Sequence, residues 1–95
     1  MYGLIAKVTV VSGRRGELAE ILADCSGQMP GCLSYVIAED LADENVLWVT
    51  ELWDSEASHR ACVTLPSVQK AITAARPIIA GFERIATTNP IKGIG

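Results

Sequence analysis

One stretch, residues 46–62, constrains the fold most, because a strand pattern there runs directly into a helix pattern. Up to Trp53 the residues are mainly β-branched, aromatic or long and apolar, and a period of two places Glu51 and Trp53 on the same face of a strand. Asp54 or Ser55 can then accept hydrogen bonds from the unpaired amides that open a helix. Because this stretch also contains both tryptophans and the only histidine, we expect any small-molecule site to lie here.

The other segments of the chain give a simple order of elements. Strands are predicted over residues 2–11, 32–39, 46–53 and 82–88, with helices over about 18–25, from near Ser55 onward, and from Pro66 to Pro77. Residues 12–16 are predicted to form a solvated turn, and Gly81 is predicted to break the chain before the last strand. The order strand, helix, strand, strand, helix, strand is typical of an α+β, ferredoxin-like split βαβ domain with a four-stranded antiparallel sheet.

The predicted strands are apolar on both faces. In a sheet with one solvent-exposed face, apolar and polar residues would instead alternate along each strand. The chain is 95 residues long, so we expect a single domain over residues 1–95 with one modest core. Hydrophobic residues nevertheless make up 49% of the chain and charged residues only 20%. We therefore expect a second sheet, from an identical chain, to cover the free face in a homodimer, and the tail beyond Asn89 to be frayed or laid on that partner.

The charge distribution argues against nucleic acid as a partner. Net charge is −3, and the eight basic residues are scattered except for Arg14 and Arg15. Nucleic-acid-binding domains instead gather positive charge into a patch or stripe. The sequence also has no apolar run near 18 residues and no charged-then-apolar leader, so we expect no membrane segment.

The cysteines favour a reducing compartment. Cys25, Cys32 and Cys62 are odd in number and not closely paired, so we expect free thiols and a cytoplasmic protein. Cys25 and Cys32 fit small buried hydrophobic residues, whereas the role of Cys62 stays open. One histidine with three dispersed cysteines does not form a zinc-binding pattern, so no metal is expected.

Three segments carry a family resemblance. Pro30 to Tyr35, Glu51 to Ala57 and Leu65-Pro66 are similar, in sequence and in order, to the antibiotic biosynthesis monooxygenase domain family. The resemblance covers nearly the whole chain and implies a dimeric α+β barrel, in which two sheets pack together with the helices outside. Members include cofactor-independent oxygenases of aromatic polyketides, haem-degrading proteins and small isomerases, so fold is implied more strongly than activity.

The sequence departs from the family pattern at its histidines. Many members have a histidine nine residues after the tryptophan and another after the proline, and these positions are Cys62 and Ser67 here. His59 follows Trp53 by six residues, so any catalytic imidazole is relocated. Haem degradation is disfavoured because the haem-ligating histidine is replaced by an apolar stripe around Ile72.

The candidate catalytic residues are His59 and Glu51. Histidine is the natural general base near neutral pH, and a carboxylate in an apolar strand can act as a base when enclosed in a cavity. A solvated His59 is the alternative, and Glu51 could instead form an ion pair with Lys7 or Arg84, or a structural hydrogen bond. A nucleophilic pair of Cys62 with His59 is possible by spacing but has no visible third group.

The candidate substrate-binding residues are Trp53, Tyr35 and Cys62. We expect an apolar cavity between sheet and helices, bordered by Trp53 and reached by His59. Trp53 could also be simply a core residue.

The resemblance then implies a cofactor-free monooxygenase of a small aromatic or enolisable molecule, without metal, flavin or haem. A proton-transfer isomerase and a non-catalytic dimeric binding or stress protein are the alternatives.

Overall fold

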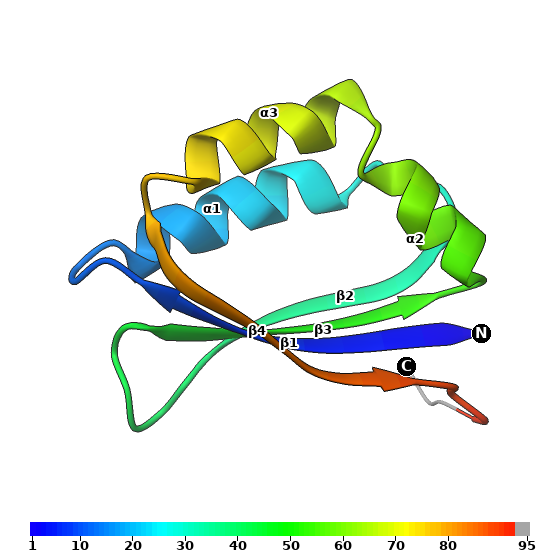
Figure 1. The fold of residues 1–95 in the computed structure, drawn as a ribbon, viewed down its shortest axis with the longest axis horizontal. Coiled ribbons are helices and arrows are strands. Elements are labelled where there is room, and N and C mark those ends of the chain that lie inside the picture. Colours follow the sequence, from blue (N-terminus) through cyan, green and yellow to red (C-terminus); the bar gives the residue numbers. More distant parts are fainter. Residues whose placement is uncertain (93–95) are drawn as a thin grey trace.

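The computed structural model describes residues 1–92, which fold into a four-stranded antiparallel sheet with three helices on one side (Figure 1). The elements are β1 Tyr2–Val10, α1 Arg15–Ser26, β2 Cys32–Glu39, β3 Val46–Trp53, α2 Glu56–Cys62, α3 Pro66–Ala75 and β4 Ile79–Thr88. In the sheet the strands lie in the order β2-β3-β1-β4. This confirms the predicted α+β, ferredoxin-like split βαβ arrangement. Of the expected tail, Gly93 and Gly95 lie outside the described residues.

The core lies between the sheet and the two longer helices, α1 and α3. On β1 every second residue from Leu4 to Val10 is buried, as period-two alternation requires, and Leu18 of α1 packs there with no exposed surface. A first cluster joins Leu18 to Val8, Val10, Leu47, Val49, Ala75 and Ile78. A second cluster, at the α2 end of the sheet, joins Met29, Trp53, Cys62 and Val68.

The junction of β3 with α2 is fixed by two local contacts. Ser55, the alternative to Asp54, is the residue that caps α2: its Oγ accepts a hydrogen bond from the Ser58 amide at 3.1 Å. The Asp54 amide in turn donates to the Gly31 carbonyl at 2.9 Å. Gly31 has φ of +85°, and a Cβ there would lie 2.6 Å from the Ser58 Cβ. Only glycine therefore lets β2 begin so close to α2.

The predicted break at Gly81 is wrong. β4 begins at Ile79, earlier than the predicted start at Phe82, and Gly81 lies inside the strand opposite Thr9. The register of β1 with β4 shifts between Thr9 and Val10, where Ala80 is the extra residue, so Gly81 keeps its partner and the strand continues past it.

The predicted solvated turn over residues 12–16 is only partly correct, because α1 begins at Arg15. The Arg15 guanidinium is tied to the connection between β2 and β3. It donates to the Asp43 carbonyl at 2.9 Å and the Asp40 carbonyl at 3.2 Å, and it pairs with Glu39 at 3.1 Å. These bonds anchor the start of α1 to the sheet, which a pattern of turn residues alone does not reveal.

The face of the sheet away from the helices carries apolar residues on its central and edge strands. Val36 of β2 is 52% exposed and lies opposite Thr50, and Ala38 lies opposite Trp48. The Trp48 Nε1 donates to Asp40 Oδ1 at 2.8 Å. This face is the side opposite the helices in Figure 1, and none of the three helices covers it. At one end Pro90 and Thr88 lie close to Gly3 of β1.

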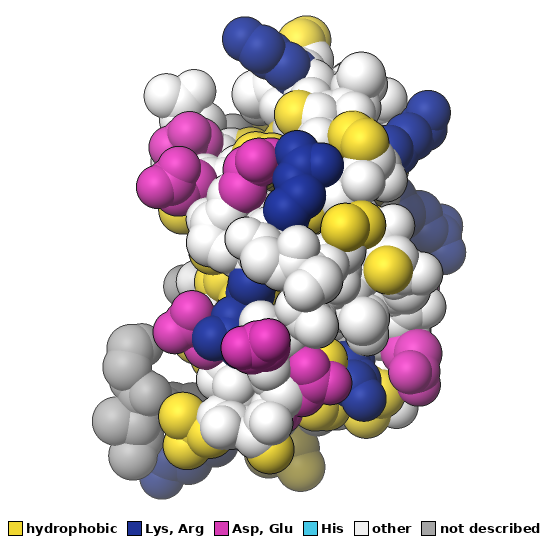
Figure 2. Space-filling model, turned by 90° about the vertical axis from the view of Figure 1, so that its left-hand side faces the viewer, with side chains coloured by type: hydrophobic (Ala, Val, Ile, Leu, Met, Phe, Trp, Pro, Cys, Tyr) yellow, Lys and Arg dark blue, Asp and Glu magenta, His cyan; other side chains and the backbone are white. Residues whose placement is uncertain are grey.

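Figure 2 views the end of the molecule that carries the turns before α1 and after β2. Acidic and basic side chains interleave there, with small apolar areas between them, so this end has no patch of one sign. All helices of the described chain are too short or too polar to cross a membrane.

Candidate active site

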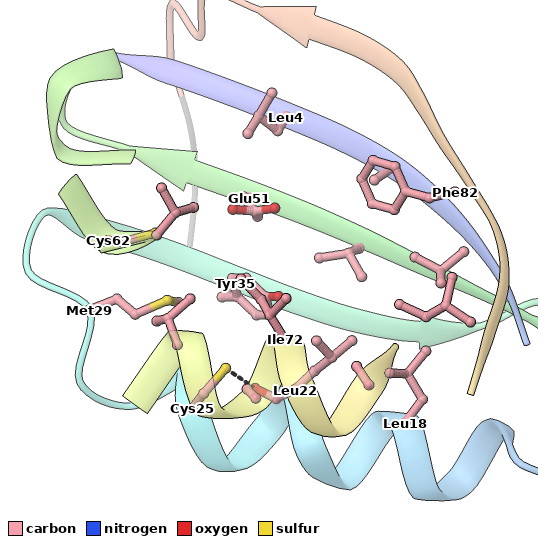
Figure 3. Close-up of a pocket in the computed structure, with 18 of the residues that line it drawn as sticks. Leu4, Leu18, Leu22, Cys25, Met29, Tyr35, Glu51, Cys62, Ile72 and Phe82 are labelled. Carbon is pink, nitrogen blue, oxygen red and sulfur yellow. Dashed lines mark hydrogen bonds between the residues drawn. The ribbon is translucent and has the colours of Figure 1, made fainter. Parts of the chain in front are cut away.

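A cavity of about 350 Å³ lies between the sheet and the helices (Figure 3). Its volume falls within the range of small-molecule sites, about 300–1,000 Å³. Most of its wall is apolar and includes Leu4, Ala6, Val8, Leu18, Leu22, Met29, Val49, Val68, Ala71, Ile72 and Phe82. Its polar lining consists of Cys25, Tyr35, Glu51, His59, Cys62, Arg76 and Arg84. Of the five predicted site residues, Tyr35, Glu51, His59 and Cys62 therefore line this cavity.

Glu51 is held by its neighbour on the same strand face. The Trp53 Nε1 donates a hydrogen bond to Glu51 Oε1 at 2.9 Å, and Glu51 projects from β3 toward the helices in Figure 3. Among residues 1–92 Glu51 forms no ion pair with Lys7 or Arg84, so of the structural alternatives the hydrogen bond is the one present. This hydrogen bond fixes the orientation of the carboxylate.

Trp53 lies behind the cavity wall rather than on it. Its side chain is fully buried and packs with Met29, Cys62 and Val68. The expectation that Trp53 borders the cavity is therefore not met, because the ring turns into the core at the end of β3. It contacts the site through the residues it supports, Glu51 and His59.

His59 lies on α2 and is half-buried. Its ring meets the Trp53 indole edge-on, with 5.4 Å between centroids and 68° between planes. The Tyr2 ring lies on another side, with centroids 5.7 Å apart. These two aromatic rings hold the imidazole at the cavity, and the alternative of a fully solvated His59 does not describe this arrangement.

Tyr35 and Cys62 are protonated at neutral pH. Burial, and then the negative charge of Glu51, raises the pKa of the Tyr35 hydroxyl well above its usual 10.0. The same two causes raise the pKa of Cys62 from 9.0 to about 11. Tyr35 can thus donate a hydrogen bond to a ligand, whereas Cys62 has little thiolate with which to act as a nucleophile.

The other two thiols lie near the same end of the cavity. Cys25 lines it, and Cys32 packs in the cluster around Trp53. Burial is the main cause that raises the pKa of both. All three cysteines are free, and no group of three or more potential ligands in the described part of the chain is arranged to hold a metal ion.

Sequence reasoning missed the residues that β4 and the end of α3 contribute to the cavity. Phe82, Arg84 and Arg76 line it and are all exposed at its rim. The alternation of Phe82 and Arg84 places them on one face, but irregular pairing with β1 decides which face that is. The two-residue spacing of Phe82 and Arg84 was the one sequence signal that these two side chains share a face of β4.

An antiparallel sheet with helices on one side, and an apolar cavity with a few polar groups between them, define a small α+β domain of the ferredoxin-like class. The sequence profile of the antibiotic biosynthesis monooxygenase family matches residues 1–74, and the chain belongs to this family.

Solved structures agree with this assignment. A candidate antibiotic biosynthesis monooxygenase from Chloroflexus aurantiacus is 48% identical, with a TM-score of 0.95 over 99% of this chain and 96% of that one. A candidate family member from Deinococcus radiodurans is 22% identical, with a TM-score of 0.81 over 100% and 97% of the two chains. One from Nitrosomonas europaea is 14% identical, with a TM-score of 0.86 over 97% and 100%. The last two show the fold alone. No curated protein matches the chain.

Proposed function

We propose that this protein is a cofactor-independent monooxygenase of a small aromatic or enolisable molecule. The observation that carries the proposal is that a carboxylate, Glu51, and an imidazole, His59, both line one apolar cavity. Family membership supports the reaction class, and the cavity supports the kind of substrate. The apolar wall around Glu51 lowers the local polarity, which strengthens electrostatic interactions with a charged intermediate.

The proposed chemistry requires a base and a substrate that forms a stable anion. His59 or Glu51 removes a proton from a CH₂ group beside an aromatic ring or carbonyl. The carbanion gives one electron to O₂, the two radicals combine, and the resulting peroxide takes up a proton. Loss of water then leaves a ketone, so that R₂CH₂ and O₂ give R₂C=O and H₂O. The carbon supplies all four electrons, and no external reductant is needed.

Each polar group has a distinct proposed role. His59 is the general base, since the rings of Trp53 and Tyr2 fix its position at the cavity. Glu51 stabilises the imidazolium or takes the proton directly. Tyr35 donates a hydrogen bond to the phenolate or enolate oxygen as negative charge develops there, because its own proton is held tightly. Trp53 positions Glu51.

We also propose that the chain works as a homodimer. The apolar face with Val36 and Trp48 would be covered by the same face of a second copy, giving the dimeric barrel expected from the sequence. In this arrangement the helices and the cavity remain on the outside of the barrel.

Anthrone, a tricyclic ketone with an acidic CH₂ group, tests the reaction. We expect uptake of one O₂ per anthrone with formation of anthraquinone, and one atom of ¹⁸O₂ in the product. The variant Lys70→Gln, on the exposed surface of α3, is the control. Exchange of the CH₂ protons in D₂O without O₂ uptake would instead indicate an isomerase. Binding with neither reaction would indicate a non-catalytic protein.

A further inference from the structure

The five arginines of the chain divide into two groups. Three form ion pairs with glutamates: Arg14 with Glu17, Arg15 with Glu39 and Arg60 with Glu56. Arg76 and Arg84 form no ion pair within residues 1–92, and both line the cavity. The two arginines without an acidic partner in the described chain are thus the two at the substrate cavity.

The sheet register places Arg84 at a defined distance from Glu51. Leu4 of β1 pairs with Glu51 of β3, and Ala6 of β1 pairs with Arg84 of β4. Arg84 is therefore two strands across and one two-residue step along from Glu51. With strands about 4.8 Å apart and a rise of about 3.4 Å per residue, the two Cα atoms are about 12 Å apart.

The surface between these two charges is apolar and partly open. Leu4 and Ala6 are buried on the helix-facing side of the sheet and form the floor there. Phe82, two residues before Arg84 on the same strand, lines the cavity yet is 60% exposed. Such a floor, with an aromatic ring at its edge, suits a flat apolar ring system.

We infer that the cavity takes an aromatic carboxylate, with the ring system over Leu4 and Ala6 and the carboxylate at the Arg84 guanidinium. Arg84 is a substrate-binding residue, and Arg76, at the end of α3, adds a second positive charge to the cavity lining. The inference rests on the proposed function for the reaction near Glu51. Recognition of the carboxylate by Arg84 concerns equilibrium binding and can be measured without that reaction. A guanidinium binds a carboxylate through two parallel hydrogen bonds, which a neutral amide cannot reproduce.

Equilibrium binding of 9-anthracenecarboxylate and of the neutral 9-anthracenecarboxamide tests this inference. The two probes share the ring system and shape, both fluoresce, and neither has the CH₂ group that the oxygenation consumes. We expect the wild-type protein to bind the carboxylate about five- to tenfold more tightly than the amide at low ionic strength. The preference should shrink as salt is added, because the arginines are partly exposed to solvent.

Variants of the arginines show which side chain produces the preference for the carboxylate. Arg84→Gln should abolish most of the preference for the carboxylate while leaving amide binding within about twofold, and Arg76→Gln should reduce it less. Arg84→Lys should retain part of it, since the charge remains but the paired geometry is lost. Arg60→Gln is the matched control, because that arginine is paired on the surface of α2 and does not line the cavity.

Two results would overturn the inference: equal binding of both probes by the wild-type protein, or an unchanged preference in Arg84→Gln with an unaltered circular dichroism spectrum. Failure of anthrone oxidation would count against the proposed function only, because the binding probes do not depend on O₂.

Discussion

The indole N–H of Trp53 donates to the carboxylate of Glu51 from two residues along the same face of β3, with 2.9 Å between Nε1 and Oε1. Because Trp53 is fully buried, its ring cannot turn away, and the acceptor oxygen stays where the core places it. The bond occupies one carboxylate oxygen, Oε1. A charged group at a cavity is in this way positioned by a residue that does not line it.

Trp53→Phe removes this hydrogen bond but keeps most of the ring volume. We expect a loss of about 1–2 kcal/mol in the free energy of unfolding and a drop of about tenfold in anthrone oxidation, because Glu51 is no longer held. Trp53→Ala should cost about 3–5 kcal/mol by leaving a cavity. Urea denaturation measures the stability, and Lys70→Gln, on the exposed surface of α3, should leave turnover unchanged. Unchanged turnover in Trp53→Phe would remove the positioning role.

His59→Asn keeps a polar side chain but removes the titratable imidazole. If His59 is the general base, anthrone oxidation should fall about a hundredfold or more while the fold is retained. Arg60→Gln, one residue along α2, is the control. A rate within threefold of wild type, together with a large loss in Glu51→Gln, would assign the base to Glu51 instead.

Gly31→Ala should destabilise the protein by about 1–3 kcal/mol. The residue has φ of +85°, and its Cβ would collide with Ser58 at the start of α2. Gly27→Ala is the matched control, since a Cβ there meets nothing within 4 Å and φ is −75°. That change should be neutral or slightly stabilising. Equal stabilities of the two variants, by urea denaturation, would contradict this account of the turn.

Cys62 should react with iodoacetamide only slowly near neutral pH, with a rate that rises toward a midpoint near pH 11. Its folded pKa lies above the ordinary 9.0, so its contribution to stability is complete below about pH 9 and is lost as pH rises toward 11. Glu51→Gln removes a negative charge that raises this pKa, so the midpoint should move to lower pH. Peptide mass analysis separates Cys62 from Cys25 and Cys32, and a midpoint near 9 in the native protein would contradict the expectation.

Light scattering at micromolar concentration should give the mass of two chains. Val36→Lys places a charge on the face proposed as the interface and should produce monomers, or lower the stability of the dimer strongly. Leu41→Lys is the control, because Leu41 is fully exposed in the turn after β2. A wild-type protein that is monomeric and stable would exclude the barrel.

Local patterns predicted the fold well because most elements have clear periods and clear ends. The bounds of β2 and β3 follow from alternation between turn residues, and Pro66 begins α3 as its fixed φ allows. β4 was harder, since its start depends on pairing with β1 across a register shift. Long-range pairing of this kind leaves no signal in neighbouring residues.

The candidate site was predictable where it is local in sequence. Glu51 and His59 lie on one strand-to-helix junction, so spacing alone brings them to one corner of the sheet. Trp53 was predicted on the correct face of β3, but it was expected at the cavity and lies in the buried core behind it. Packing at the end of the strand decides between these two positions. Arg84 was considered only as a partner of Glu51, whereas the sheet keeps the two residues two strands apart.

The junction of β3 with α2 gives the protein a modular organisation. Both groups proposed for proton transfer, Glu51 and His59, lie within residues 51–62, whereas the two arginines of the cavity come from the end of α3 and from β4. Reactivity and ligand choice can therefore change independently through substitutions in separate segments. An exchange of residues 51–62 with the same segment of a homologue should transfer the reaction while the preference for an anionic ligand stays with the host.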